Sequence, residues 1–162
     1  MIFPLLDTPL TNAQTNTPIR IRFRPLIPLR VAGPNGRLID LEALVDTGAD
    51  EVLLPDTLLP AFGFASGSGI TRGTSGIGGR TTVVFHPIRL EIRANPNDRI
   101  AWHATVGFAK LSLHVAMFGL AGGLEFFHTT LNVIDRQLGL FPHPTIPLAA
   151  PCVSPHVAFS VP

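Results

Sequence analysis

The chain has 162 residues, of which 46% are hydrophobic and 14% charged, so it is long and apolar enough to bury one core and is not a disordered tail. Its formal net charge of +1 comes with eleven scattered Arg and a single Lys, which gives no reason to expect nucleic acid or an anionic membrane as partner. The lone Cys152 excludes a disulfide framework or a cysteine metal site within the chain.

No targeting signal is evident in the sequence. Residues 1–7 lack both the basic stretch and the full apolar stretch of a signal peptide, and no run of about 18 apolar residues could span a bilayer. We therefore expect a cytoplasmic protein without a membrane partner.

Sixteen Pro and fifteen Gly interrupt the chain at short intervals, which favours short strands over long helices. Residues 1–18 are predicted to form an N-terminal leader or arm, because residues 4–18 are rich in Thr, Asn and Pro. Strands are predicted at Pro25–Val31 and Leu38–Val45, on either side of a hairpin turn at Asn35-Gly36.

The middle of the chain predicts further short strands. A short buried strand is expected at Val52–Leu54, and one helical turn within Pro55–Phe62. Seven glycines make Gly63–Gly79 too flexible to be core, and two strands follow at Thr81–Phe85 and Ile88–Ile92.

The last third predicts a strand, a brief helix, a hairpin and a tail. The turn is expected at residues 95–97, the strand at 102–108, the helix at 124–128, and the hairpin at 130–134 and 138–141. Six prolines after Phe141 predict an extended or disordered tail over residues 143–162. The pattern as a whole predicts a small all-β barrel or sandwich.

Residues 43–50, Ala-Leu-Val-Asp-Thr-Gly-Ala-Asp, carry the most informative motif. Apolar residues alternate with Asp40 and Glu42 up to Val45, so a half-buried strand delivers Asp46 into a tight turn. The motif occurs once, so a catalytic Asp46 would be half of an active site.

A single carboxylate near pKa 3.9 is a poor general base at neutral pH and cannot act as an acid. Two carboxylates about 3 Å apart repel by about 5 kcal/mol at an effective dielectric near 20, equivalent to roughly four pKa units. Such a pair keeps one proton over a broad pH range, so one member takes a proton from water while the other donates one to a carbonyl oxygen. This is the chemistry of peptide hydrolysis without a covalent intermediate.

The neighbours of Asp46 fit this chemistry. Thr47 can supply a hydroxyl that bonds across a two-fold axis, and Gly48 allows close approach to a carboxylate and unusual backbone angles. Ala49 is small where two loops would meet.

These residues resemble the retropepsin-like aspartic peptidases, single-domain homodimeric relatives of pepsin. Residues 43–50 match the catalytic motif, and Leu53-Leu54-Pro55 follow as in bacterial members. Ser75-Gly-Ile-Gly-Gly79 resembles the flap tip, and residues 120–134 resemble more loosely the segment that holds the family's short helix.

The resemblance covers about residues 19–142 and implies a small closed or partly open barrel with one short C-terminal helix, assembled as a homodimer. Asp46, Thr47 and Gly48 would form the catalytic loop in each chain. Ile77, Gly78 and Gly79 would form a flap over a bound peptide. Structural residues near the site would be Ala49, Asp50 and Gly122, and neither metal nor other cofactor is implied.

One position departs from the family's pattern. Arg usually follows the glycine of the third motif, but Gly123 and Leu124 stand there, so the partner of Asp50 is left open among Arg72, Arg80 and Arg99. The six histidines show no metal-ligand spacing, and no phosphate-binding glycine pattern is present.

The sequence leaves three alternative functions open. The first is an aspartic endopeptidase that acts as a homodimer on a peptide or protein substrate. The second is a fold of the same type kept as a dimerisation or peptide-binding module with little or no catalysis. The third is a monomeric β-barrel that binds a ligand or partner.

Overall fold

A computed structural model describes residues 1–11, 18–76, 79–110 and 115–149, and within them it contains twelve strands and two three-residue 3-10 helices. The first six strands are β1 (Ile2–Pro4), β2 (Leu6–Thr11), β3 (Pro18–Arg24), β4 (Leu26–Ala32), β5 (Leu38–Val45) and β6 (Leu53–Pro55). The remaining strands are β7 (Ile70–Gly76), β8 (Gly79–Arg93), β9 (Arg99–Ala109), β10 (Ala116–Phe118), β11 (Phe127–Asn132) and β12 (Gln137–Pro142). The helices are η1 (Asp56–Leu58) and η2 (Leu124–Phe126), and no helix in this part of the chain is long and apolar enough to cross a membrane.

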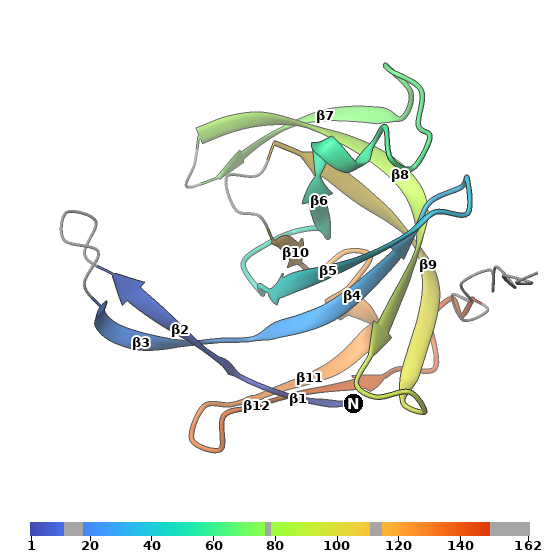
Figure 1. The fold of residues 1–162 in the computed structure, drawn as a ribbon. Helices are drawn as coiled ribbons and strands as arrows, with labels where there is room; N and C mark the ends of the chain where they lie inside the picture. The colour runs from blue at the N-terminus through green and yellow to red at the C-terminus, as the bar shows by residue number, and fades with distance from the viewer. Residues whose placement is uncertain (12–17, 77–78, 111–114, 150–162) are drawn as a thin grey trace, which may run out of the picture.

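The main sheet closes into a barrel (Figure 1). Its strand order is β4-β5-β10-β6-β9-β8-β7, and β4 also pairs with β8, so six strands form a ring to which β7 is attached. The predicted all-β barrel is therefore confirmed. The interior is filled by aliphatic and aromatic side chains, and Trp102 packs edge-on against Phe118 and Phe127.

A second sheet, of order β1-β12-β11, lies beside the barrel at the lower end of Figure 1. The first residues of the chain belong to it. Phe3 and Leu5 are buried in the core, and the amino group of Met1 donates a hydrogen bond of 3.1 Å to the carbonyl of Leu140. The prediction of a leader over residues 1–18 did not anticipate this packing, and residues 12–17 lie outside the described part of the chain.

Several predicted elements are confirmed with small shifts in their ends. β4 and β5 pair antiparallel as expected, and the turn between them closes with a hydrogen bond from Gly36 N to Gly33 O. Gly36 has a φ of 79°, a conformation that glycine adopts at little cost. β6, β9 and the hairpin of β11 and β12 also match predicted strands.

Two strands differ from the prediction. β8 runs without a break through Pro87, where two shorter strands were expected. One edge of β8 pairs with β7 up to Phe85 and with β4 from Arg89 onward, which leaves residues 86–88 unpaired on that edge. Pro87 lies in this gap, so its lack of an N–H removes no hydrogen bond to a strand on that edge. The glycine-rich segment after Gly63 contains β7, which pairs with β8 outside the core.

The C-terminal part corrects two further predictions. The helix expected at Leu124–His128 is a single 3-10 turn, Leu124–Phe126, because Phe127 already begins β11. The tail over residues 143–149 is packed rather than loose: Ile146 is buried, Leu148 forms a bridge with Trp102, and Ala149 N donates to Ala101 O. The rest of the predicted tail, residues 150–162, lies outside the described residues.

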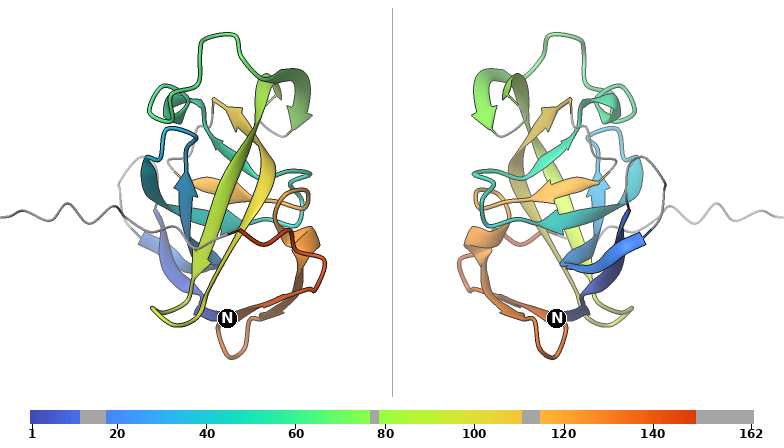
Figure 2. Two further views of the ribbon diagram at one scale, coloured as in Figure 1. Left: turned by 90° about the vertical axis from the view of Figure 1, so that its right-hand side faces the viewer. Right: turned by 90° about the vertical axis from the view of Figure 1, so that its left-hand side faces the viewer.

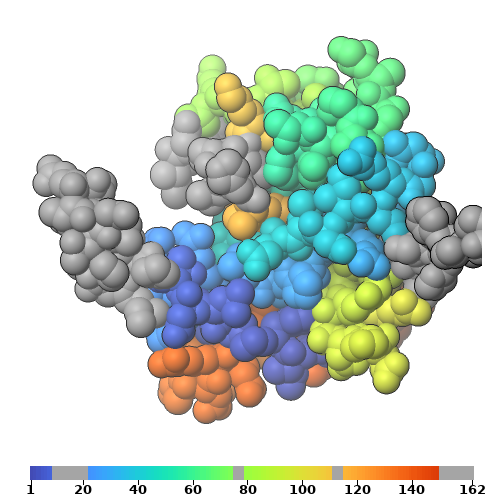
Figure 3. All heavy atoms as spheres, in the orientation of Figure 1, coloured from blue at the N-terminus to red at the C-terminus, as the bar shows by residue number. Residues whose placement is uncertain are grey.

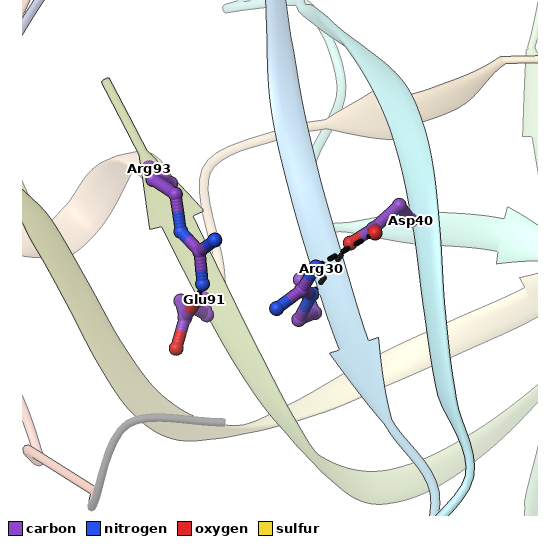
Figure 4. A network of polar contacts seen from close by, with 4 residues as sticks. All are labelled: Arg30, Asp40, Glu91 and Arg93. Atoms are coloured by element: carbon purple, nitrogen blue, oxygen red, sulfur yellow. Dashed lines mark hydrogen bonds and ion pairs between the residues drawn. The ribbon is translucent and has the colours of Figure 1, made fainter. Parts of the chain in front are cut away.

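A row of charged residues crosses β5, β4 and β8 on the outside of the barrel (Figure 4). Arg30 donates two hydrogen bonds to the Asp40 carboxylate, at 2.6 and 2.8 Å, and Arg93 donates one of 2.7 Å to the buried Glu91. The hydrogen bonds from Arg30 lower the pKa of the Asp40 carboxyl, while partial burial acts in the opposite direction. The Arg30–Asp40 pair thus joins β4 to β5, and the Arg93–Glu91 pair lies within β8.

Asp40→Asn should therefore destabilise the protein only where the carboxyl is ionised. A carboxyl whose pKa is lower in the folded chain contributes stability above its unfolded pKa of about 3.9, and that stability is lost as the pH falls through the folded pKa. Because Asp40 is largely exposed, we expect a loss of only about 0.5 kcal/mol at pH 7. Urea unfolding from pH 7 to pH 3 measures it, with Glu42→Gln, an exposed carboxylate on the same strand, as the control. An Asp40→Asn effect that persists undiminished at pH 3 would contradict this account.

Ile146→Ala tests whether the tail belongs to the folded domain. Loss of a buried isoleucine side chain should lower the free energy of unfolding by about 2 kcal/mol, whereas Leu148→Ala, at a 68% exposed position, should change it by less than about 0.5 kcal/mol. Thermal or urea unfolding compares the two variants. Equal small effects would show that residues 143–149 contribute nothing to the core.

Candidate active site

Asp46 begins the loop that follows β5, and its backbone is held from two sides. The N–H of Val45 donates to Pro25 O at 2.9 Å, and the N–H of Asp46 donates to Phe118 O at 3.1 Å, where β5 and β10 run parallel. The residue is half-buried at the end of the strand. The backbone position of Asp46 is therefore set by the barrel and not by a free loop.

The turn then orients the side chain of Asp46. Gly48 N donates a hydrogen bond of 2.9 Å to Asp46 Oδ1, and Ala49 N donates one of 3.2 Å to Asp46 O. One carboxylate oxygen is thus committed to the turn. Thr47 is exposed, and its predicted bond across a two-fold axis stays a prediction.

Gly48 performs one of the two tasks predicted for it. A Cβ at this position would lie 3.2 Å from Asp46 Oδ1, so the absence of a side chain leaves room for the carboxylate. Its φ is not positive, so the turn does not require backbone angles closed to other residues.

A second loop, residues 119–123, supports the loop after Asp46. Leu120 N donates to Ala49 O at 2.9 Å, Ala121 N donates to Asp50 O at 2.8 Å, and Val52 N donates back to Ala121 O at 3.0 Å. A Cβ on Gly119 would lie 2.3 Å from Glu51 O and 2.6 Å from Ala49 O. The two loops meet backbone to backbone, and Ala49 is buried. Its predicted place where two loops of the dimer meet stays a prediction.

Gly122 and Gly123 occupy the turn before η2. Gly122 has a φ of 80°; its N–H donates to Glu125 Oε1 at 2.6 Å, and its carbonyl accepts from Trp102 Nε1 at 2.9 Å. A Cβ on Gly123 would lie 2.7 Å from Gly119 O and 2.8 Å from Val52 Cγ2, so this backbone has no room for arginine there. The Glu125 carboxylate, which the sequence analysis did not single out, fastens the supporting loop instead. The sequence could have indicated this bond: Glu125 lies three residues after Gly122, the spacing at which a carboxylate bonds to a backbone N–H at the start of a helix.

Asp50 has no ion pair within 4 Å among the described residues. Of the three arginines considered for it, Arg72 lies 3.9 Å from Glu51 and 5.0 Å from the centre of the Phe85 ring. Arg99 is the first residue of β9 and stands opposite Arg93 in the β8–β9 strand register. Arg80 lines the same cleft as Asp50.

This cleft separates the Asp50 loop from the hairpin of β7 and β8. Its volume is about 640 Å³. Its lining consists of Asp50, Gly73, Thr74, Arg80, Thr81 and Thr82. The hairpin of β7 and β8, near the top of Figure 1, therefore lies across this cleft from the loop that Asp46 begins.

The structure describes the hairpin but not its tip. The last pair is Gly76 with Gly79, and Gly79 has a φ of 101°, as a sharp hairpin end requires. Ile77 and Gly78 lie outside the described residues, so their role as a flap stays a prediction. Within the described ranges no group of three or more His, Cys, Asp or Glu side chains could hold a metal ion.

Comparisons with known proteins give limited similarity. No family model matches the chain, and no curated protein matches it. Among solved structures, the protease of EIAV in complex with the inhibitor HBY-793 is 20% identical, with a TM-score of 0.41 over 59% of this chain and 81% of that one. The architecture described above rests on the strand pairings of this chain and not on that similarity.

Gly119→Ala tests the backbone contact that supports the Asp46 loop. The added methyl group would meet two carbonyl oxygens, so we expect a loss of about 1–3 kcal/mol in the free energy of unfolding. Gly73→Ala is the matched control, since nothing lies within 4 Å of a Cβ there and its φ is not positive. Urea unfolding of both variants measures the difference. Equal midpoints would show that the two loops are not in close contact.

Proposed function

We propose that the chain is a retropepsin-like aspartic endopeptidase that acts as a homodimer, with one Asp46 from each copy. The observation that supports it best is the placement of Asp46. Its backbone is bonded to β10, one of its oxygens is bonded to Gly48 N, and its loop faces a β-hairpin across a cleft. The resemblance to bacterial members in Leu53-Leu54-Pro55 belongs to the same proposal.

Two copies are needed because the Asp-Thr-Gly motif occurs once in the chain, so each copy supplies one carboxylate of the pair. In the pair, the ionised carboxylate removes a proton from water, and the water oxygen attacks the peptide carbonyl carbon. The other carboxyl gives its proton to the carbonyl oxygen, which forms a tetrahedral diol. The carboxyl that took the proton of water then gives it to the amine nitrogen as the C–N bond breaks. A diol hydroxyl returns its proton to the other carboxylate as the C=O bond re-forms, so the pair again holds one shared proton. The reaction requires no cofactor.

The remaining site residues follow from this arrangement. The exposed Thr47 hydroxyl would bond to the loop of the other copy and hold the two turns together. Ile77, Gly78 and Gly79, at the end of the hairpin, would offer backbone N–H groups to an extended peptide in the cleft. Asp50 would remain near the substrate, because it lines the cleft without an ion pair.

Exposed apolar side chains support self-association. The sheet β1-β12-β11 and the turn between β11 and β12 carry Ile2, Leu131, Ile134 and Phe141, with Ile134 93% exposed. Apolar residues gathered on one sheet of a small protein are typical of an interaction surface. By the strand register, Ile2 and Phe141 lie on one face with Gly139, whereas Leu131 lies on the opposite face with Leu138. A second copy placed on the first face would bury Ile2 and Phe141.

The alternative is a dimerisation or peptide-binding module of the same fold with little or no catalysis. The absence of an ion pair for Asp50 within the described ranges favours it, while the intact Asp-Thr-Gly turn and the hairpin oppose it. A monomeric β-barrel binder is a third alternative, and a light-scattering mass at increasing concentration separates it from the other two.

Asp46→Asn should abolish proteolysis. Because the amide can neither accept the proton of water nor share one with its partner, we expect the rate to fall by about a thousandfold or more. Hydrolysis of an unstructured protein between pH 4 and pH 7, with and without pepstatin, provides the measurement. Asp56→Asn, which removes a carboxylate from η1, is the control and should retain the wild-type rate. Proteolysis by Asp46→Asn at the wild-type rate would exclude the proposed pair, and a wild-type protein without turnover would favour the binding module.

A further inference from the structure

The hairpin of β2 and β3 forms a two-stranded sheet of its own. Its residues pair only with each other, from Leu6 with Arg24 to Thr11 with Pro18, and neither strand joins the barrel or the β1-β12-β11 sheet. An isolated two-stranded hairpin is at best marginally stable in water. This hairpin, which we call the arm, therefore lacks the packing surface that a stable strand pair needs.

Contacts at the base of the arm fix its direction. Leu5, just before β2, is buried and donates its N–H to Arg136 O at 2.8 Å. The Arg136 guanidinium lies 3.7 Å from Asp7 and 4.3 Å from the centre of the Phe23 ring, so it touches both strands of the arm. At the other end Pro25 O accepts a hydrogen bond from Val45 N. These contacts attach the base of the arm to the body, and its two strands pair only with each other.

The arm extends on the side of the molecule that carries the candidate active site. In Figure 1 it projects to the left, the side toward which β5 points and where the hairpin of β7 and β8 ends, and Figure 2 (right) looks onto that side. Figure 3 shows the described base of the arm beside the body with the β11 and β12 hairpin below it. A six-residue strand spans about 20 Å, which is long enough to reach over part of a neighbouring molecule.

We infer that the arm packs against a second copy of this chain and clasps it on the face that carries Asp46. The inference rests on the proposed function, since a second copy that brings its Asp46 to this one must approach the face that the arm flanks. In a two-fold dimer each arm would contact the other copy, so the contact forms twice.

The composition of the arm fits such a contact. Within the described side chains of β3, the exposed apolar Phe23 lies between Arg22 and Arg24. At its base Leu6 and Phe23 are exposed, and the exposed Ile2 and Ile134 belong to the adjoining sheet and its turn. Exposed apolar side chains are thus present both at the base of the arm and on the adjoining sheet and its turn.

Shortening the arm tests the inference. In the variant, an Asn-Gly turn replaces residues 8–22 and joins Asp7 to Phe23, which leaves the contacts of Arg136 in place. Sedimentation velocity over a concentration series should show a dimer dissociation constant raised at least tenfold, with circular dichroism confirming the fold. Leu148→Ser is the control, since it removes an exposed apolar side chain from the tail, at a residue that bridges to Trp102 of β9.

The outcomes separate this inference from the proposed function. An unchanged dissociation constant in the shortened variant overturns the inference and leaves the peptidase in place. A wild-type dimer without proteolysis overturns the peptidase and leaves the arm contact in place. A wild-type chain that stays monomeric at every concentration overturns both.

Photo-crosslinking of the full chain decides the matter should the shortened variant fail to fold. A benzophenone side chain in place of Thr8, in a mixture of isotopically light and heavy protein, should yield peptides that join light to heavy copies. Absence of such mixed peptides would overturn the inference.

Discussion

The contact between two loops, residues 46–52 and residues 119–123, sets the position of the candidate catalytic group. Three hydrogen bonds join their backbones, and Gly119 lets them approach until carbonyl oxygens of one loop lie where a methyl group of the other would stand. Asp46 adds a fourth bond to this side of the barrel through Phe118 O. Because these bonds are between main-chain atoms, the carboxylate is positioned by the fold and not by the rotamers of long side chains.

The same contact explains why this chain lacks a bulky basic residue beside the site. Gly123 packs so closely against Gly119 and Val52 that its backbone position excludes any side chain. The Glu125 carboxylate bonds to Gly122 N, and Trp102 bonds to Gly122 O from inside the barrel. A charged acceptor on a backbone donor is a strong hydrogen bond, so the Glu125 carboxylate stabilises this turn without a basic side chain.

The sequence predicted those parts of the fold that depend on local patterns. The alternation that ends at Val45 predicted β5, Asn35-Gly36 predicted the turn before it, and the Asp-Thr-Gly motif predicted a carboxylate held in a tight turn. It did not predict features that depend on distant partners. Pro87 fits inside β8 because the neighbouring strands leave one edge of β8 unpaired there. The three residues of β10 form a strand because β5 and β6 pair with them on either side. Phe3, Leu5 and Ile146 are buried through contacts with residues distant in the sequence, which their prolines and polar neighbours did not indicate.

The central claim is that two Asp46 carboxylates meet across a two-fold axis and share one proton. A crystal structure of the assembled protein, with the separation of the two Asp46 side chains as its readout, tests this claim most directly. The account predicts carboxylate oxygens about 3 Å apart at the centre of a symmetric dimer. A dimer whose two Asp46 side chains face away from each other, or an assembly that leaves both open to solvent, would contradict it.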